Sequence, residues 1–189
     1  MNTRGTQRVL FAGGRRFEVR LNKERTRRLG LLFQWERGKI LPWLMLNPSV
    51  AGLELTTDNL DPTLRRVLGF TRAMKYCGFA IYNLYSLIAT DPHGLSVEDP
   101  RDLHHDLEPL RDVAGANDVV VAAWGANPKA EPRLQAAWHM FEDNRTRFVA
   151  LGTTQAGWPR HPLYLPKTAR PRPWQPPWPD GRPHGWERG

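Results

Sequence analysis

The sequence predicts an α/β fold, a three-layer sandwich with a central, mostly parallel sheet flanked by helices. Short apolar segments alternate with segments of helical spacing, which favours such a sheet. The β-branched run at 118–123 (DVVVAA) is typical of a strand covered on both faces. Asp-Pro pairs begin two of the helical segments. We expect one domain at 1–165 and a Pro/Trp/Arg-rich tail at 166–189.

Six segments have the spacing of strands. Residues 17–21 (FEVRL) alternate between apolar and polar side chains, as a half-buried strand does. Two further strands, 29–35 and 39–46, are joined by a turn at 36–38, and the early strands form an N-terminal extension of the sheet. The remaining apolar runs predict strands at 79–84, 118–123 and 146–151.

Three segments have the spacing of helices. Asp61-Pro62 begins the first helix, with Asp61 as the N-cap, and Gly78 ends it. Asp99-Pro100 begins a second helix that continues to about Ala114. A third helix covers about 131–143. The chain thus alternates between strands and helices after residue 40.

The composition favours a polyanionic partner. Lys and Arg number 27 against 19 Asp and Glu, which gives a net charge of +8. Nucleic acid is the commonest partner of so basic a chain, although charge can also serve solubility alone. Cys77 is the single cysteine, so neither a disulfide nor a cysteine zinc site is expected. No metal or cofactor is expected. The absence of a signal peptide and of long apolar segments predicts a cytoplasmic protein, and we expect it to be a monomer.

The tail from Pro166 has seven prolines, three tryptophans and five basic residues without periodicity. Such a composition favours an extended, polyproline-like segment. Three arrangements remain open: a disordered end, a segment wrapped on the domain, or an arm that contacts nucleic acid through Arg and Trp.

Polar residues follow four of the predicted strands. In open α/β sheets, ligands bind beyond the carboxyl ends of the strands, so these residues are expected to converge on one pocket. They are Asn47-Pro48-Ser49, Asn83 to Ser86 with Tyr85, Trp124-Gly125, and the segment 152–164 with Arg160 and His161.

The series LNPS, DPT, NLYSLIATDP, WG and PRHPLYL resembles the family DUF1643 over about residues 40–166. The order of these motifs is in turn similar to the uracil-DNA glycosylase superfamily. Members of that superfamily have a first motif after an early strand, an Asn at the end of a middle strand, a strand leading into WG, and a late His-Pro loop. The resemblance implies a uracil-DNA glycosylase-like fold.

The resemblance also implies a role for each matched residue. Asn47 would position the attacking water, Asn83 would recognise the base edge, and His161 would hydrogen-bond the leaving base. The residues around His161 would press into the minor groove. No Asp occurs in 47–49, where the fastest uracil enzymes have one, so catalysis would depend on Asn47 or on Asp58 or Asp61. The substrate-binding residues would be Pro48, Ser49, Asn83, Tyr85, Trp124, Gly125 and Arg160.

Breaking an N-glycosidic bond leaves positive charge on the sugar and negative charge on the base. His161 can donate a hydrogen bond to the base even when it is neutral, and the amide of Asn83 matches a pyrimidine edge. A flipped base also needs an aromatic floor, for which Tyr82, Tyr85 and Trp124 are candidates. Each residue has a structural alternative: a buried amide that satisfies loop backbone, a loop-fixing His, or a helix cap at Asp61.

The sequence therefore predicts a monofunctional DNA glycosylase that flips out and hydrolyses a modified or damaged pyrimidine from double-stranded DNA. No Lys stands out as a Schiff-base nucleophile, so strand cleavage is not expected. The substrate is predicted to be a phage-type hypermodified cytosine, in phage defence, or otherwise uracil in repair. Two alternatives are a non-catalytic nucleic-acid-binding protein on the same fold and an enzyme that processes nucleosides or nucleotides.

Overall fold

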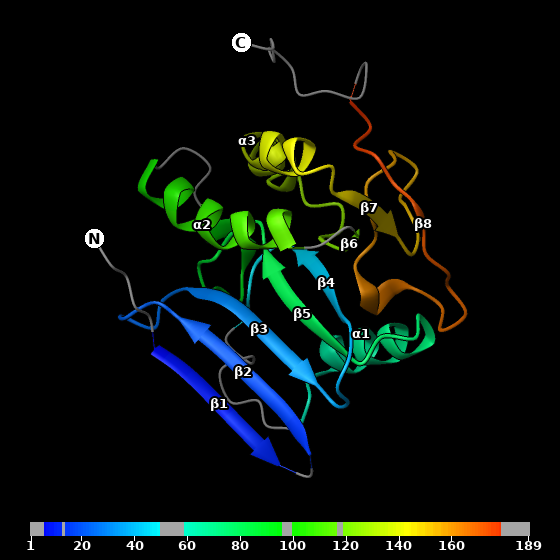
Figure 1. Ribbon diagram of the computed structural model, residues 1–189. Coiled ribbons are helices and arrows are strands. Elements are labelled where there is room, and N and C mark those ends of the chain that lie inside the picture. The colour runs from blue at the N-terminus through cyan, green and yellow to red at the C-terminus, as the bar shows by residue number, and fades with distance from the viewer. Residues whose placement is uncertain (1–5, 13, 50–58, 96–99, 117–118, 179–189) are drawn as a thin grey trace.

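The computed structural model describes residues 6–12, 14–49, 59–95, 100–116 and 119–178. These form an α/β domain, shown in Figure 1. Its strands are β1 (Thr6–Ala12), β2 (Arg15–Leu21), β3 (Arg28–Gln34), β4 (Ile40–Met45), β5 (Gly78–Asn83), β6 (Val119–Ala122), β7 (Arg147–Ala150) and β8 (Arg172–Pro173). Its helices are α1 (Pro62–Ala73), α2 (Pro100–Ala116) and α3 (Ala130–Asp143), with short 3₁₀ turns η2 (Pro92–Gly94) and η3 (Pro162–Tyr164).

The strands form one mixed sheet in the order β1-β2-β3-β5-β4-β6-β7-β8. Only β5, β4, β6 and β7 are parallel to one another, whereas β1, β2, β3 and β8 join by antiparallel pairing. The prediction of a mostly parallel sheet is therefore wrong. Short connections join β1, β2 and β3, and such connections can only pair strands antiparallel, whereas parallel pairs need a longer crossover. The turn at 36–38 does not pair its two strands, because β5 lies between them.

Helices cover both faces of the sheet. Side chains alternate along β4, so that Trp43 and Met45 pack on the α1 side with Val67, whereas Leu44 packs on the α2 and α3 side with Leu134. Two hydrophobic cores therefore lie on opposite faces of the central strands. Figure 1 shows α2 and α3 together, apart from α1.

The first helix begins as the sequence predicts. Asp61 is its N-cap, and Oδ1 of Asp61 accepts a hydrogen bond from the backbone N–H of Leu64 at 2.8 Å. Pro62 occupies the first turn, where the missing N–H costs nothing. The second helix begins at Pro100, and its predicted cap, Asp99, lies outside the described residues.

Residues 166–178 pack against the domain. Strand β8 pairs antiparallel with β7, and Trp174 Nε1 donates to the carbonyl oxygen of Gly157 at 2.8 Å. Trp174 meets Trp124 edge to face, with ring centroids 5.1 Å apart, and Trp178 Nε1 donates to Glu131 at 3.1 Å. Trp174 and Trp178 are both buried. These residues thus extend the α3-side core with aromatic rings.

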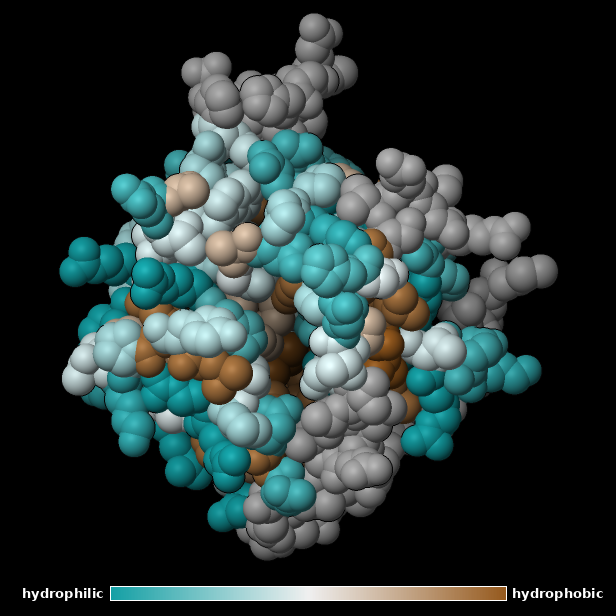
Figure 2. All heavy atoms as spheres, turned by 180° about the vertical axis from the view of Figure 1, so that it is seen from behind, coloured by the Kyte–Doolittle hydropathy of each residue, from teal (hydrophilic) through white to brown (hydrophobic). Residues whose placement is uncertain are grey.

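The outer surface is mixed in polarity. Figure 2 shows the face behind the view of Figure 1, where hydrophobic side chains lie at the bottom of a hollow between hydrophilic ones. Within the described ranges, no helix combines the length and the apolar character needed to cross a membrane.

Candidate functional site

The candidate site lies at the carboxyl edge of the parallel strands, on the α1 side of the sheet. Asn83 is the last residue of β5 and pairs with Met45 at the end of β4. Arg28 reaches the same edge from the other direction, because β3 runs antiparallel to β5 and begins there. This edge is where ligands bind in open α/β sheets.

Asn83 is a buried amide without partners. Asn83 is 4% exposed, and among the residues that the structure describes, neither Nδ2 nor Oδ1 has a hydrogen-bond partner. Two residues before it, Ile81 packs in the α1-side core, so alternation directs Asn83 to that face. An unpartnered buried amide costs about 1–3 kcal/mol for each unsatisfied group, and such groups in a native fold call for an explanation. A ligand that donates and accepts hydrogen bonds along one edge would satisfy both atoms.

Arg28 is a buried cation that sequence reasoning missed. Its Nε has no partner, and burial lowers the pKa of its guanidinium to about 10, although the charge of Asp61 opposes this shift. The backbone N–H of Arg28 donates to the carbonyl oxygen of Ser86 at 2.8 Å, which fixes its position beside the end of β5. No pattern in the sequence marks Arg28 as buried, because the run Arg25 to Arg28 is mostly basic and typical of an exposed turn.

His161 lies between Gly125 and the charge of Asp61. A Cβ atom built on Gly125 would stand 3.6 Å from the Cβ of His161. Burial lowers the pKa of His161, and the charge of Asp61 partly opposes that shift. Nδ1 accepts from the backbone N–H of Leu163 at 3.4 Å, so the neutral ring carries its hydrogen on Nε2. His161 is thus a neutral donor that the turn η3 holds in place.

Asp61 links the two ends of the site. Its charge acts on both Arg28 and His161, which come from opposite sides of the central strands. Since β4 alone separates β5 from β6, the strand ends that carry Asn83 and Gly125 lie about two strand spacings, or ~10 Å, apart.

The loop at 47–49 is tied to the segment that follows β5. Asn47 Nδ2 donates to the carbonyl oxygens of Ala89 at 2.7 Å and of Pro48 at 3.3 Å. The Pro48 carbonyl in turn accepts from the N–H of Ala89 at 3.0 Å. The hydrogen bonds described for Asn47 both use Nδ2 as the donor. Pro48 is buried and Ser49 is exposed, and Asp58 lies outside the described residues.

A buried charge network supports this segment from the other face. Asp106 of α2 is 1% exposed, and its Oδ1 accepts from both the backbone N–H and the hydroxyl of Ser86 at 2.6 Å. Arg27 and Arg133 lie within 3.3 and 3.4 Å of the same carboxylate. Burial raises the pKa of Asp106, while the hydrogen bonds from Ser86 and the arginine charges oppose this. The network holds the chain just beyond Asn83.

The aromatic candidates lie away from Asn83. Tyr85 packs in the α3-side core, its hydroxyl donates to the carbonyl oxygen of Lys129 at 2.7 Å, and Arg133 lies 4.6 Å above its ring. Trp124 packs against Trp174 in the same core, and Tyr82 lies partly buried against it. The structure therefore does not bring these three rings together with Asn83.

Arg160 lies on the other side of the His161 loop. Its backbone N–H donates to the carbonyl oxygen of Gly152 at 2.9 Å, and its side chain lines a pocket of about 630 Å³. The pocket lies between the end of β7 and the C-terminal segment, and Arg170 and Arg172 also line it. Arg66 of α1 donates to the carbonyl oxygens of Pro162, at 3.3 Å, and Leu165, which ties the loop to α1.

The structure thus places Asn47, Asn83 and Gly125 after neighbouring strands at one edge of the sheet. His161 lies against Gly125, and Asp61 is close enough for its charge to act on both Arg28 and His161. In the part of the chain that the structure describes, no three His, Cys, Asp or Glu side chains gather as a metal site would require. The side chains at this edge include amides, a guanidinium, a carboxylate and an imidazole whose Nε2 carries the hydrogen when the ring is neutral.

Comparison with curated proteins and with solved structures found no match for this chain. A family model described as protein of unknown function (DUF1643) matches residues 28–163, which span every residue of the candidate site. The matched region extends from Arg28, at the start of β3, to Leu163 in η3. Because the match covers most of the sequence, the chain belongs to the DUF1643 family.

Proposed function

We propose that this protein is a monofunctional DNA glycosylase that hydrolyses the N-glycosidic bond of a flipped pyrimidine. The observation that carries the proposal is the buried amide of Asn83, whose two polar atoms lack partners at the carboxyl edge of the sheet. A pyrimidine presents a donor and an acceptor, or two of one kind, along one planar edge, and an amide can match that edge. Binding of such a base would remove the cost of leaving Asn83 unsatisfied.

His161 supplies the donor for the departing base. When the bond breaks, its electron pair leaves with the base, and negative charge spreads to a carbonyl oxygen of the ring. The Nε2–H of a neutral imidazole stabilises that oxygen without first giving up a proton. The lowered pKa of His161 keeps the ring neutral at the pH of the cell. A single preorganised donor of this kind is worth about 10²–10³ in rate.

Water completes the reaction on the sugar side. Oδ1 of Asn47 accepts a hydrogen bond from the attacking water, whose oxygen forms the new bond to the sugar carbon. The carboxylate of Asp61 stabilises the positive sugar and receives the proton that the water loses. Asp61 keeps its capping bond to Leu64 through Oδ1 during this step, and Oδ2 is the oxygen left for the proton. The anionic base then takes up one proton and Asp61 releases one, so that the products are an abasic site and the neutral free base.

The loop of His161 also carries the features that base flipping needs. Leu163 and Tyr164 are 41% and 75% exposed, and they follow His161 directly. Apolar side chains inserted between base steps hold a duplex open while a base is outside the stack. The net charge of +8 favours the phosphate backbone as a partner. Exposed side chains that can insert between bases, next to a site for a flipped base, favour DNA over a free nucleoside as the substrate.

The proposed substrate is a modified pyrimidine. The resemblance of the motif order to the uracil-DNA glycosylase superfamily supports base excision. The departure from that pattern at 47–49, without an Asp, supports a base other than uracil. A hydroxymethylated or glucosylated cytosine of the kind found in phage DNA fits this proposal, with a role in phage defence. Uracil in repair is the second substrate to test.

The experiment is incubation of the protein with duplexes that carry uracil, a mismatch, hydroxymethylcytosine or glucosylated hydroxymethylcytosine. Alkali then cleaves the strand wherever an abasic site has formed. We expect cleavage with at least one duplex and a loss of about 10²-fold or more in His161→Ala. His104→Ala is the matched control, because His104 is exposed on α2 and outside the site. Intact strands with all duplexes, or equal rates in the two variants, would overturn the proposal.

A further inference from the structure

We infer that the pocket between the end of β7 and the C-terminal segment is a phosphate site that binds the backbone of DNA. The inference deepens the proposed function and rests on it for the identity of the polymer. The pocket has a volume of about 630 Å³, in the range of ligand sites. It is built from two segments distant in sequence, because β8 pairs with β7 and carries residues 168–174 past Gly152 and Thr153.

The pocket has the charge and the donors that a phosphate needs. Three arginines line it, Arg160, Arg170 and Arg172, and none of the lining residues is acidic. The guanidinium group binds phosphate oxygens through a planar fork of N–H donors, so arginine is the favoured residue for such contacts. The hydroxyl-bearing Thr153 and Thr168 also line the pocket and supply neutral donors.

Some of the described arginines are paired with carboxylates, and the three arginines of the pocket are not among them. Arg16, Arg20, Arg27 and Arg133 each form an ion pair with a carboxylate. In the ranges that the structure describes, no ion pair with Asp or Glu involves the three arginines of the pocket. Arg170 instead donates to the carbonyl oxygens of Thr168, at 3.0 Å, and Ala169, at 3.3 Å. Three like charges around one pocket favour an anion between them.

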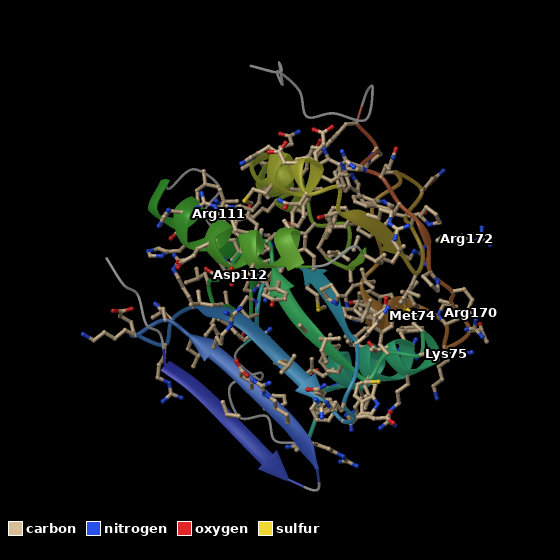
Figure 3. The ribbon with its side chains drawn as sticks, viewed as in Figure 1. Met74, Lys75, Arg111, Asp112, Arg170 and Arg172 are labelled. Atoms are coloured by element: carbon tan, nitrogen blue, oxygen red, sulfur yellow. The ribbon has the colours of Figure 1, made fainter. Side chains whose placement is uncertain are left out.

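The pocket and the candidate site share one loop. Arg160 lines the pocket, and the next residue, His161, lies against Gly125 in the site. Arg66 ties the same loop to α1. A DNA strand whose base enters the site would therefore pass its phosphate backbone over Arg160. Figure 3 shows Arg170, Arg172 and Lys75 along one side of the molecule, whereas Arg111 lies on α2. The C-terminal segment thus acts as a backbone clamp beside the base site.

The test measures binding of a fluorescent duplex without any modified base, by anisotropy at several salt concentrations. The variant Arg170→Gln/Arg172→Gln removes two charges from the pocket. The control Arg37→Gln/Arg111→Gln removes two charges from exposed arginines elsewhere. We expect the pocket variant to lose about tenfold in affinity and about 1–2 in the slope of log Kd against log salt. In the control variant, the affinity and the slope should change much less. The variant Arg170→Lys/Arg172→Lys, which keeps both charges, should retain the original slope.

Equal losses in the pocket and control variants would overturn the inference, as would the absence of binding to the duplex. A second arm uses a fluorescent deoxynucleoside monophosphate. If the pocket variant loses only the monophosphate and keeps the duplex, the pocket serves free nucleotides and the inference is wrong. Because no base is excised in these assays, their outcome is separate from the glycosylase test. Thermal unfolding of each variant verifies that the exposed substitutions leave the fold intact.

Discussion

The side chain of His161 lies directly against Gly125, with 3.6 Å between the Cβ of His161 and a Cβ built on the glycine. Gly125 follows β6 and has a φ of +83°, a conformation that L side chains rarely adopt. The backbone therefore turns there without a side chain, and the Cβ and backbone N of His161 lie beside the turn. Trp124 and Gly125 thus have different roles: the first packs in the α3-side core, and the second makes room for the site.

Replacement of Gly125 by Ala should destabilise the fold by about 1–2 kcal/mol, because the left-handed conformation is strained for any residue with a Cβ. The added methyl would stand at an ordinary contact distance from His161, so excision activity should persist. The matched control is Gly69→Ala, since Gly69 lies in α1 with no atom within 4 Å of its Cβ position. That change should stabilise the protein by about 0.5–1 kcal/mol. Urea unfolding measures both, and changes of the same sign would contradict the assignment.

The pH dependence of stability should report the buried state of His161. Its pKa is lowered from the ordinary 6.5 by burial. Below pH 6.5 the unfolded chain therefore binds a proton that the folded chain does not, and the free energy of unfolding falls as the pH decreases. The loss continues until the pH reaches the lowered pKa of the folded state, and above pH 6.5 the contribution is complete.

The comparison for this prediction is His161→Asn, which keeps an acceptor for the N–H of Leu163 but does not titrate. The free energy of unfolding of the protein with His161, minus that of the His161→Asn variant, should decrease as the pH falls from 8 to 5. Urea titrations at four pH values measure it, and carboxylates common to both proteins cancel. A difference that stays constant across this range would show that His161 titrates as an exposed histidine does.

Much of the fold followed from the sequence because periodicity marks buried faces. The predicted strands at 17–21 and 79–84 and the helix at 131–143 are present with ends shifted by a few residues. The order of the strands in the sheet could not be predicted as well, since apolar alternation does not indicate which neighbour a strand pairs with. Strand β8 was missed because a short Arg-Pro pair has no strand pattern, and only its pairing with β7 identifies it as a strand.

The candidate site could be predicted only in part from the sequence, for a similar reason. Polar residues after apolar strands marked Asn83 and His161, because the carboxyl edge of a sheet is a general place for ligands. Arg28 approaches that edge at the start of an antiparallel strand, and no rule from chain order marks such a position. The aromatic candidates Tyr85 and Trp124 lie on the other face, which depends on the side-chain alternation beyond each strand end.

The packing of the C-terminal segment gives a third prediction. Trp174→Ala should cost about 3–5 kcal/mol, because the ring is buried among aromatic side chains and its Nε1 bonds to the carbonyl oxygen of Gly157. Trp174→Phe should cost about 1 kcal/mol or somewhat more, since it loses the hydrogen bond and keeps most of the apolar area. Urea unfolding measures both. A cost below about 0.5 kcal/mol for Trp174→Ala would mean that the segment is not part of the folded core.

The two amides of the site should respond to the same substitution with opposite effects on stability. Asn47 is satisfied, since its Nδ2 donates to the carbonyl oxygen of Ala89 at 2.7 Å. Asn47→Ala removes that bond and should destabilise the fold by about 1–2 kcal/mol. Asn83 is buried with both polar atoms unpartnered, so Asn83→Ala removes groups that already cost free energy. The free energy of unfolding of the Asn83→Ala variant should stay unchanged or rise by about 1 kcal/mol.

Both substitutions should nevertheless lower base excision by about 10²-fold, because each removes a hydrogen-bonding group that acts on water or on the base. In a binding site that a ligand completes, we expect residues that destabilise the protein without its ligand and yet are required for activity. Thermal unfolding and the abasic-site assay on the same preparations measure the two effects. If Asn83→Ala destabilised the protein as much as Asn47→Ala does, Asn83 would have partners in the folded protein. The argument for a base at that position would then fail.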